Sequence, residues 1–215
     1  MKESYEAKDS TYYGLARSDL LQYVPTEIER VLEIGCGQGF FGASLKSRFG
    51  CSVMGIELVE QAAIHARTRL DSVLVGDALH LAGSIDPDRF DLIVLNDVLE
   101  HFADPEALLR LYTEKLAPDG LFFLAVPNVR HWSVVKALVL GGRWTYADWG
   151  ILDRTHLRFY TRRSLEDFVA SVGLRTHSVN LHIGAGSKSS LANSVTLGIA
   201  KEFLAPHIVV LAGRA

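Results

Sequence analysis

Near its start the chain reads Val31-Leu32-Glu33-Ile34-Gly35-Cys36-Gly37-Gln38-Gly39. The apolar residues predict a buried strand, and the alternating glycines predict a tight turn directly after it. Glycine permits positive φ and has no Cβ, so a bound molecule can approach the backbone of such a turn closely. Glu33 places a carboxyl group near the end of the strand, where ligands bind in open parallel sheets. The stretch therefore predicts a cofactor site in an α/β fold.

Strand-like and helix-like segments alternate along the rest of the chain, which is typical of a doubly wound α/β sheet. We predict seven strands, at residues 30–34, 52–56, 72–75, 90–95, 121–126, 175–183 and 207–212. We predict helices between them at residues 40–49, 59–68, 105–116 and 164–172.

Three further segments have recognisable local patterns. Proline, aspartate and glycine predict turns at residues 86–88 and 117–120. Residues 188–204 have apolar side chains at four-residue spacing, which predicts a core-facing helix. Residues 129–163 do not fit the alternation and are expected to form an insert.

The composition indicates one globular domain, residues 1–215, with 48% hydrophobic and 22% charged residues. A net charge of −3 gives no general attraction to nucleic acid or to an anionic membrane. No apolar run approaches the roughly 18 residues of a membrane span, so we expect no membrane insertion. Two cysteines, Cys36 and Cys51, favour a reducing compartment, and we predict a cytoplasmic protein. The oligomeric state is left open.

Acidic residues follow each of the first three predicted strands. Glu33 lies in the glycine turn, Glu57 follows the second strand and Asp77 follows the third. Because ligands bind outside the carboxyl ends of parallel strands, we expect these acids to line one crevice. Such a crevice suits an extended, polyhydroxylated, cationic ligand.

A dinucleotide site is the competing interpretation of the glycine turn. The residues from Gly37 to Gly42 match G-x-G-x-x-G, and Glu57 lies 20 residues beyond Gly37. A pyrophosphate at the following helix would, however, be repelled by the carboxylate of Glu33. The acid before the turn therefore favours a cationic cofactor.

The motifs together resemble those of the class I S-adenosylmethionine-dependent methyltransferases, in particular small bacterial members. The resemblance is carried by residues 33–39, Glu57, residues 76–78, residues 90–101 and residues 116–121. It implies a Rossmann-like seven-stranded sheet, mostly parallel with an antiparallel last strand and helices on both faces. It also implies a transferase that uses S-adenosyl-L-methionine.

The resemblance assigns roles to individual residues around that cofactor. Besides Glu33, the implied cofactor residues are Gly35, Gly37 and Gly39 at the methionyl part, Glu57 at the ribose hydroxyls, Asp77 and Ala78 at adenine, and Asn96 at the sulfonium end. Residues 1–28, with Tyr12, Tyr13 and Arg17, resemble the amino-terminal cover of the family.

His101 follows the fourth strand, where the acceptor should enter, and is our candidate for a general base. Asp97, Glu100 and His101 also resemble the metal-binding pattern of some quinone-precursor and RNA 3′-end methyltransferases, with His131 or His156 as a further ligand. That pattern usually has Glu where Asp97 stands. Our main prediction is therefore a site without a metal.

Residues 129–163 form a local cationic insert with seven Lys or Arg, two Asp and all three tryptophans. Aromatic faces and guanidinium groups suit a ring-bearing anion, such as a sugar nucleotide. Residues 150–161 also resemble the D-x-T-H-x-R-F-Y segment of methyltransferases that are often associated with bacterial surface-sugar biosynthesis. The candidate acceptor residues are Arg130, His131, Trp149, Arg154, His156 and Arg158. An internal ion-pair network of Asp153, Arg154, His156 and Arg158 is the alternative.

The predicted function is O-methylation of a small anionic or sugar-like molecule, with S-adenosylmethionine as the methyl donor. One alternative is a metal-assisted O-methyltransferase of a phenolic quinone precursor. Another is a cofactor-binding protein without transfer activity.

Overall fold

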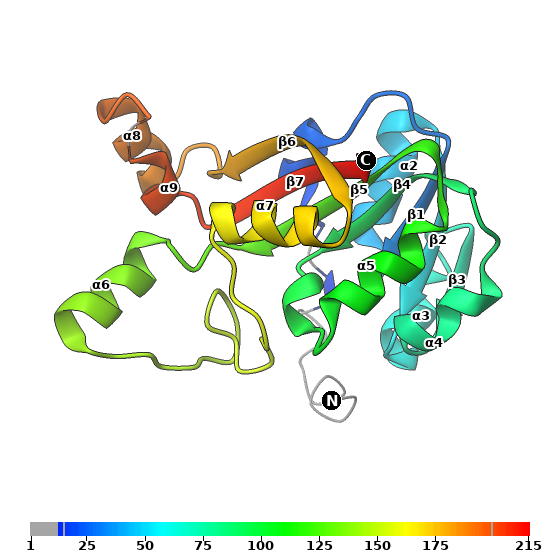
Figure 1. The fold of residues 1–215 in the computed structure, drawn as a ribbon, viewed down its shortest axis with the longest axis horizontal. Helices are drawn as coiled ribbons and strands as arrows, with labels where there is room; N and C mark the ends of the chain where they lie inside the picture. The colour runs from blue at the N-terminus through cyan, green and yellow to red at the C-terminus, as the bar shows by residue number, and fades with distance from the viewer. Residues whose placement is uncertain (1–12, 15, 199) are drawn as a thin grey trace.

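The computed structural model describes residues 13–14, 16–198 and 200–215, and these contain a seven-stranded sheet (Figure 1). The strands are arranged in the order β3-β2-β1-β4-β5-β7-β6. Strands β1 to β5 pair in parallel, and β7 is antiparallel to both β5 and β6. The strands are β1 (Arg30–Ile34), β2 (Ser52–Glu57), β3 (Ser72–Val75), β4 (Phe90–Asn96), β5 (Leu116–Pro127), β6 (Leu174–His182) and β7 (His207–Arg214). The predicted fold class is confirmed.

The α-helices of the described residues are α2 (Phe40–Phe49), α3 (Glu60–Ala66), α4 (Ala78–Leu81), α5 (Pro105–Thr113), α6 (Trp132–Gly141), α7 (Arg162–Ser171), α8 (Lys188–Val195) and α9 (Lys201–Leu204). Short 3-10 helices are η2 (Ser18–Tyr23), η3 (Ala82–Ser84) and η4 (Leu99–His101). Capping residues explain where several of these helices begin or end. Gly50 ends α2 in the left-handed conformation, Asp104 caps α5 with Pro105 as its first residue, and Thr161 and Ser164 form a capping box on α7.

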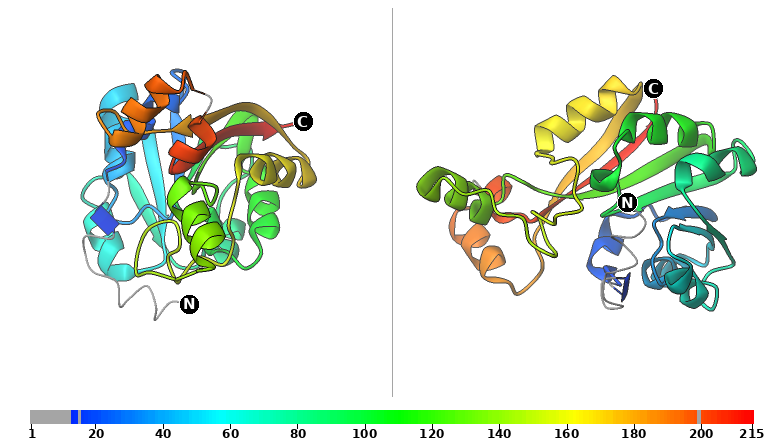
Figure 2. Two further views of the ribbon diagram at one scale, coloured as in Figure 1. Left: turned by 90° about the vertical axis from the view of Figure 1, so that its left-hand side faces the viewer. Right: turned by 90° about the horizontal axis from the view of Figure 1, so that it is seen from below.

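The sheet buries apolar side chains on both faces because neighbouring residues of a strand point to opposite sides. Leu32 of β1 joins a cluster with helices α4, α5 and α7, whereas Val31 joins a second cluster with η2, α2 and α3. The views in Figure 2 show this three-layer arrangement. It leaves the carboxyl ends of the parallel strands as the edge where a site can form.

The predicted turn at residues 117–120 lies inside β5. Phe90 pairs with Leu116 and Leu92 pairs with Leu121, so four residues of β5 lie between two successive pairs with β4. The turn-forming residues therefore make an irregularity within a strand.

The prediction of one core-facing helix over residues 188–204 is wrong. The segment forms two helices, α8 and α9, because Leu197 and Gly198 between them adopt left-handed backbone conformations. Leu191 and Val195 are 70% and 76% exposed, so the four-residue spacing does not mark a core face. A single left-handed residue is enough to end an α-helix.

Helices α6, α8 and α9 extend away from the body of the sheet (Figures 1 and 2). Helix α6 was not predicted, and only Val134 among its residues is buried. Several large apolar side chains on α6 and in the following loop are exposed, including Leu140 and Trp149. Within the described residues, no helix combines the length and apolarity needed to cross a membrane.

Candidate active site

The glycine turn after β1 is held by β2 and by the amino-terminal segment. The N–H groups of Gly35 and Cys36 donate to the carbonyl of Ile56 at 2.8 and 3.1 Å. The N–H of Gln38 donates to the carbonyl of Tyr13 at 3.1 Å. Gly37 has a φ of 54°, and a Cβ there would lie 2.8 Å from the Tyr13 oxygen. Glycine is required here because two backbone segments meet.

Glu57 ends β2 with its carboxylate turned into the glycine turn. One oxygen accepts the N–H of Gly37 at 2.8 Å and the other accepts the N–H of Val59 at 2.9 Å. Burial raises the pKa of Glu57, and these hydrogen bonds oppose the shift. A carboxylate oxygen has two lone pairs, so each oxygen can accept one further hydrogen bond. A ribose with two neighbouring hydroxyl groups has the donors to make both.

Glu33 lies on the opposite side of the turn, beneath α2. A Cβ on Gly42 would lie 2.6 Å from Oε2 of Glu33, and Glu33 as a residue is 3% exposed. Burial raises the pKa of Glu33 to about 8; the N–H of Gly42 opposes this shift and the charge of Glu57 adds to it. The described residues give Oε2 no hydrogen-bond partner. Glu33 therefore faces the base of α2, while Glu57 faces the turn.

Asp77, Ala78 and Asn96 occupy the same edge of the sheet. Asp77 caps α4 by accepting the N–H of Leu79 at 2.8 Å. The carbonyl of Ala78 accepts the hydroxyl of Tyr112 at 2.8 Å, which fixes the start of α4. Asn96 ends β4, and its buried Oδ1 has no hydrogen-bond partner among the described residues. An ammonium group at this edge would satisfy that oxygen.

These features fit S-adenosylmethionine. The glycine turn has no side chains in its left-handed positions, so a ligand can approach its backbone closely. Each carboxylate oxygen of Glu57 can still accept one hydroxyl hydrogen bond. The unpartnered Oδ1 of Asn96 suits an ammonium donor. Asp77 and Ala78 begin α4 beside β3, where an adenine would extend. The predicted cofactor residues thus lie along one edge, with Glu33 turned away beneath α2.

Arg17 connects the amino-terminal segment to the acceptor end of the sheet. Its guanidinium forms an ion pair with Asp97, directly after β4, and lies 3.3 Å from Nε2 of His207. Asp97 Oδ1 lies 3.2 Å from the same nitrogen. The predicted cover residue Tyr13 contacts the glycine turn through its carbonyl, while Tyr12 lies outside the described residues. Asp97 is therefore engaged with Arg17 and His207.

His101 is buried beside His156 and Glu100. Its Nδ1 lies 3.2 Å from the carbonyl of Thr155, and its ring centroid lies 4.7 Å from that of His156. Burial, with the charge of His156, lowers the pKa of His101 to about 4. The three side chains offer ligand atoms that all lie within 4.8 Å of one another. Both carboxyl oxygens of Glu100 are buried without a hydrogen-bond partner in the described part of the chain.

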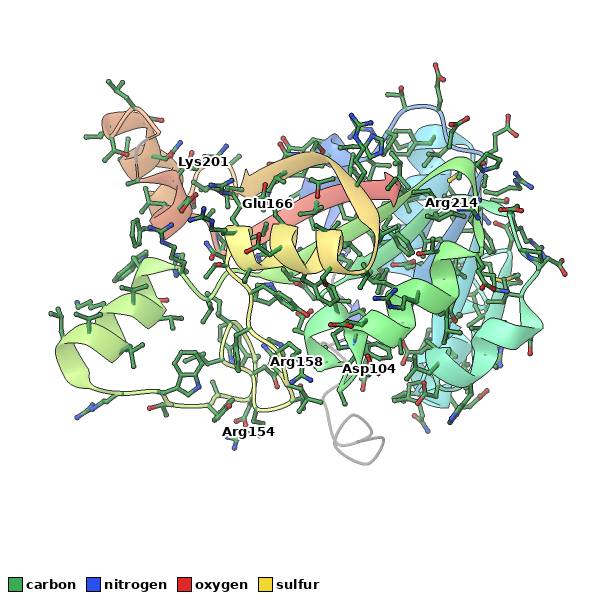
Figure 3. All side chains as sticks on the ribbon, viewed as in Figure 1. Asp104, Arg154, Arg158, Glu166, Lys201 and Arg214 are labelled. Carbon is green, nitrogen blue, oxygen red and sulfur yellow. The ribbon has the colours of Figure 1, made fainter. Side chains whose placement is uncertain are left out.

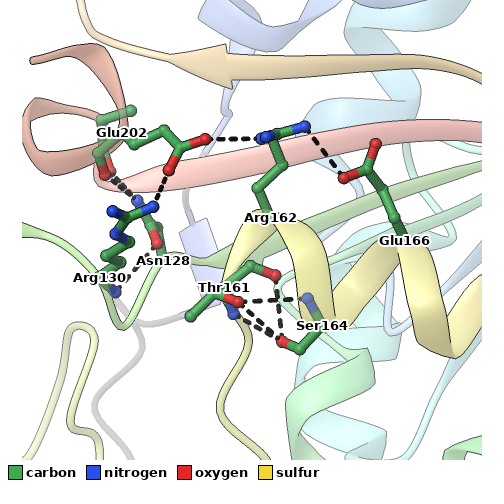
Figure 4. Close-up of polar contacts among 8 residues, drawn as sticks. Asn128, Arg130, Thr161, Arg162, Ser164, Glu166 and Glu202 are labelled. Carbon is green, nitrogen blue, oxygen red and sulfur yellow. Dashed lines mark hydrogen bonds and ion pairs between the residues drawn. The ribbon is translucent and has the colours of Figure 1, made fainter. Parts of the chain in front are cut away.

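Arg130 and Arg162 belong to an ion-pair network that joins distant segments (Figure 4). Arg130, which follows β5, pairs with Glu202 of α9 and lies over the ring of Phe203 at 4.5 Å. Arg162 of α7 pairs with Glu202 at 2.8 Å and with Glu166 at 3.1 Å. The candidate acceptor residue Arg130 therefore holds α9 in place.

Two other candidate arginines of the insert also have protein partners, and both lie at its lower rim in Figure 3. Arg154 pairs with Asp148 at 2.8 Å on the surface. Arg158 donates to the carbonyl of Ala103 at 2.6 Å. His156 is buried beside Glu100, with its Nδ1 3.0 Å from the carbonyl of Ile151. These partners, which are Asp148, two backbone carbonyls and Glu100, all lie outside the four-residue ion-pair network that the sequence offered as the alternative.

His131 and Trp149 complete the candidate acceptor residues. His131 precedes α6, and burial, with the charge of His207, lowers its pKa. Trp149 is 78% exposed. The structure therefore brings His131 towards the site and leaves Trp149 on the surface.

A family model described as a methyltransferase domain matches residues 5–179. The chain belongs to the methyltransferase domain family. It is 31% identical over 179 residues to the ubiquinone biosynthesis O-methyltransferase of Parvibaculum lavamentivorans, covering 78% of this chain and 66% of that protein. It is 28% identical over 117 residues to the enzyme of the same name from Neisseria meningitidis serogroup A, covering 52% and 49%. The chain thus spans about half the length of the latter relative.

Solved methyltransferase structures share the fold. An S-adenosylmethionine-dependent methyltransferase from Archaeoglobus fulgidus superposes with a TM-score of 0.69 at 18% identity, covering 93% of each chain. One from Mesorhizobium loti gives a TM-score of 0.65 at 19% identity, covering 94% of this chain and 99% of that one. The predicted resemblance is confirmed for family and fold, and these matches agree with S-adenosylmethionine as the predicted cofactor.

The sequence analysis of this methyltransferase domain missed His207. The predicted antiparallel last strand could have indicated it, because such a strand begins at the edge of the sheet where the parallel strands end. His207 pairs in register with Pro127, the last residue of β5, and with His182, the last residue of β6. It therefore lies at the edge that holds the candidate site, although it is 110 positions beyond Asp97 in the chain.

Proposed function

We propose that this chain is an S-adenosylmethionine-dependent O-methyltransferase of a small anionic or sugar-like acceptor. The observation that carries the cofactor assignment is the placement of Glu57 against the glycine turn, with both carboxylate oxygens able to accept ribose hydroxyls. The names of the curated relatives support oxygen as the methylated atom. The cationic, tryptophan-containing insert supports an anionic, ring-bearing acceptor.

In this proposal the bound cofactor supplies a methyl group on a positively charged sulfur. The glycine turn and Asn96 hold the methionyl end, Glu57 holds the ribose, and Asp77 with Ala78 borders adenine. Transfer is an in-line displacement, so holding the acceptor in line contributes to the rate, and orientation of this kind can lower a barrier by roughly 7–11 kcal/mol. Tyr13, which contacts the glycine turn, and Arg17, which pairs with Asp97, are expected to shield the reacting atoms from water.

Calorimetry with S-adenosylmethionine tests the cofactor assignment. Replacing Glu57 by Gln removes a charged acceptor, and charge-assisted hydrogen bonds contribute roughly 1.5–3 kcal/mol each, so we expect at least tenfold weaker binding. The matched control is Glu60→Gln, three residues along, where an exposed carboxylate pairs with Arg67. Equal affinity of wild type and the Glu57 variant would refute the ribose assignment.

A screen with methyl-labelled cofactor tests the reaction and its acceptor. Sugar nucleotides, acidic glycans and phenols are offered in parallel, and the labelled product is isolated. Transfer to a sugar nucleotide or acidic glycan supports the proposed acceptor class. Cofactor binding without transfer to any acceptor would instead support a non-catalytic binding protein.

One observation favours a second candidate function, metal-assisted O-methylation of a phenolic quinone precursor. Glu100, His101 and His156 converge, and the Glu100 carboxyl oxygens are buried without hydrogen bonds among the described residues. One carboxylate and two imidazoles suit a divalent cation, which would polarise a phenolic oxygen. Asp97, the other acid of the predicted pattern, pairs with Arg17 and His207 instead. Turnover of phenols that a chelator abolishes and Mg²⁺ or Zn²⁺ restores would favour this candidate.

A further inference from the structure

The exposed apolar side chains of the protein are concentrated on one side of it. Among the described residues, fourteen large hydrophobic side chains are exposed, and twelve of them lie in residues 132–157 or 191–203. These segments belong to the insert and to helices α8 and α9, on the side that faces the viewer in the left panel of Figure 2. The other two, Ile64 and Leu111, lie on α3 and α5. We call the insert together with residues 188–204 the exposed lobe.

The exposed lobe combines aliphatic and aromatic side chains. Leu138, Val139 and Leu140 follow one another on α6, and all three are exposed. All three tryptophans of the chain and Tyr146 are exposed in the same lobe. Monomeric proteins rarely leave large apolar patches uncovered, and such patches mark interaction sites. Tryptophan and tyrosine are enriched where an apolar phase meets water, because their rings are apolar and carry a polar N–H or O–H group.

The exposed lobe is also the cationic part of the chain. It carries nine Lys or Arg and three acids, whereas the rest of the chain carries thirteen Lys or Arg and twenty-two acids. Lys136 and Arg143 flank the apolar residues 138–140, and both are exposed. Neither enters an ion pair among the described residues, unlike Arg130 and Arg154. The lobe therefore attracts an anionic partner, although the net charge of the whole chain is −3.

A second copy of this chain matches the exposed lobe less well than an anionic lipid surface does. Two lobes placed face to face would bring like charges together, which opposes association. A lobe placed on the acidic remainder of another copy would find, among the described residues there, only Ile64 and Leu111 as large exposed hydrophobic side chains. An anionic lipid surface offers negative charge with an apolar phase directly beneath it.

We propose that the exposed lobe docks on an anionic lipid surface, with α6 lying in the plane of the headgroups. The ten residues of α6 extend about 15 Å, half of the roughly 30 Å hydrocarbon core, so a helix of this length lies along the surface. Residues 138–140 enter the boundary of the acyl chains, and Trp149 lies at the level of the headgroups. Lys136 and Arg143 lie near the lipid phosphates. The proposal is independent of the proposed methyl transfer.

The docked face adjoins the edge of the sheet that holds the candidate site. His131 directly precedes α6, and His207 begins β7 shortly after α9. The ion pair between Arg130 and Glu202 joins the start of the insert to α9 (Figure 4). The two parts of the lobe are therefore connected beside the site and reach the lipid surface together.

Vesicle sedimentation with the full chain measures the docking directly. Vesicles of phosphatidylcholine are compared with vesicles in which a quarter of the lipid is phosphatidylglycerol. We expect at least tenfold tighter binding to the anionic vesicles at about 0.1 M salt. This preference should disappear at about 1 M salt, because the screening length falls from roughly 10 to 3 Å.

Two double variants separate the apolar and the charged contributions. Val139→Ser with Leu140→Ser should weaken binding to the anionic vesicles at least tenfold, because two aliphatic side chains no longer leave water. Lys136→Gln with Arg143→Gln should also weaken it at least tenfold, since each basic residue near an anionic lipid surface contributes about fivefold. The matched controls change exposed residues elsewhere and should bind like wild type: Ile64→Ser with Leu111→Ser, and Arg48→Gln with Arg110→Gln.

Tryptophan emission locates the contact. All three tryptophans lie in the insert, so emission reports on the lobe alone. We expect the emission to shift to shorter wavelength on anionic vesicles and to be quenched by brominated lipid. Vesicle binding without either change would show that another part of the chain makes the contact, and would overturn the proposal.

Other outcomes would also overturn the docking. One is the absence of binding to anionic vesicles, and another is binding that both lobe variants retain within about threefold. Sedimentation velocity without lipid tests the second copy: a stable wild-type dimer that dissociates on changing Val139 and Leu140 to Ser would assign the lobe to self-association instead. Circular dichroism and thermal melts verify that each variant is folded. None of these measurements requires methyl transfer, so failure of the proposed function is detected separately.

Discussion

The cofactor edge and the insert hold their charged side chains by different means. At the carboxyl ends of β2 and β3, Glu57 and Asp77 accept hydrogen bonds from backbone N–H groups within the same local segment or the adjacent turn. In the insert and the segments beside it, Arg130 and Arg162 are held by Glu202, some 40 or more residues away. Backbone donors are present wherever the strand and turn form, whereas the arginine partners depend on how remote segments meet.

The two regions also differ in burial. Helix α2, which follows the glycine turn, buries Phe41 and Leu45 against the sheet. Helix α6 in the insert exposes Leu138, Val139 and Leu140. The comparison indicates that the glycine turn and α2 are part of the stable core, while α6 of the insert contributes little to the stability of the sheet.

A stability measurement gives the largest contrast. Leu45 is fully buried, and Leu45→Ala should cost about 2–5 kcal/mol of unfolding free energy because it leaves a cavity. Leu140 is 77% exposed, and Leu140→Ala should change the same quantity by less than about 0.5 kcal/mol. Chemical denaturation measures both. Equal losses would contradict the comparison by showing that α6 buries its apolar face in solution.

The buried acid on the cofactor side predicts a dependence of stability on pH. Burial raises the pKa of Glu33 from 4.5 to about 8, so between these values the folded protein binds more protons than the unfolded chain. Its contribution to the free energy of unfolding therefore falls as the pH rises from 4.5 to about 8, by up to about 1.4 kcal/mol per pH unit.

Glu33→Gln should flatten this decline, as measured by urea unfolding at several pH values. The matched control is Glu60→Gln, which replaces an exposed acid and should preserve the decline. A pH dependence that is the same in wild type and in the Glu33 variant would show that this carboxyl is ionised in the folded protein.

The glycine turn allows the contact with the amino-terminal segment to be separated from backbone strain. Gly37 and Gly50 both have left-handed φ angles, so an alanine at either costs roughly 1–2 kcal/mol. Only at Gly37 would the new Cβ meet another group, the Tyr13 oxygen at 2.8 Å; at Gly50 nothing lies within 4 Å. We expect Gly37→Ala to weaken S-adenosylmethionine binding at least tenfold in calorimetry and Gly50→Ala to leave it unchanged. Equal affinities of the two variants would contradict the placement of the cofactor against the glycine turn.

The smallest effect is expected on the insert. Arg154 and Asp148 form a surface ion pair, and such pairs contribute about 0–1 kcal/mol. Arg154→Ala should therefore lower the free energy of unfolding by less than about 1 kcal/mol in chemical denaturation. A larger loss would mean that this exposed segment is integrated into the core as firmly as the cofactor edge.

The sequence predicted the sheet well because its signals are local. Helix α2 begins and ends at the predicted residues, and β1 and β3 have their predicted bounds, since apolar runs bounded by glycine or acidic residues mark such elements clearly. The prediction failed over residues 188–204, where the left-handed residues Leu197 and Gly198 interrupt an otherwise regular apolar spacing. Helix α6 was missed because its apolar residues are not distributed on one buried face.

The candidate site divides in the same way. The sequence by itself determined the glycine turn, the acids after β2 and β3, and the family, because each depends on short spacings along the chain. Only the tertiary structure decided that Glu33 faces α2, that Arg130 is held by Glu202, and that Asp97 meets Arg17 and His207. These contacts join residues far apart in the chain, and their partners are selected by how strands and helices pack against one another.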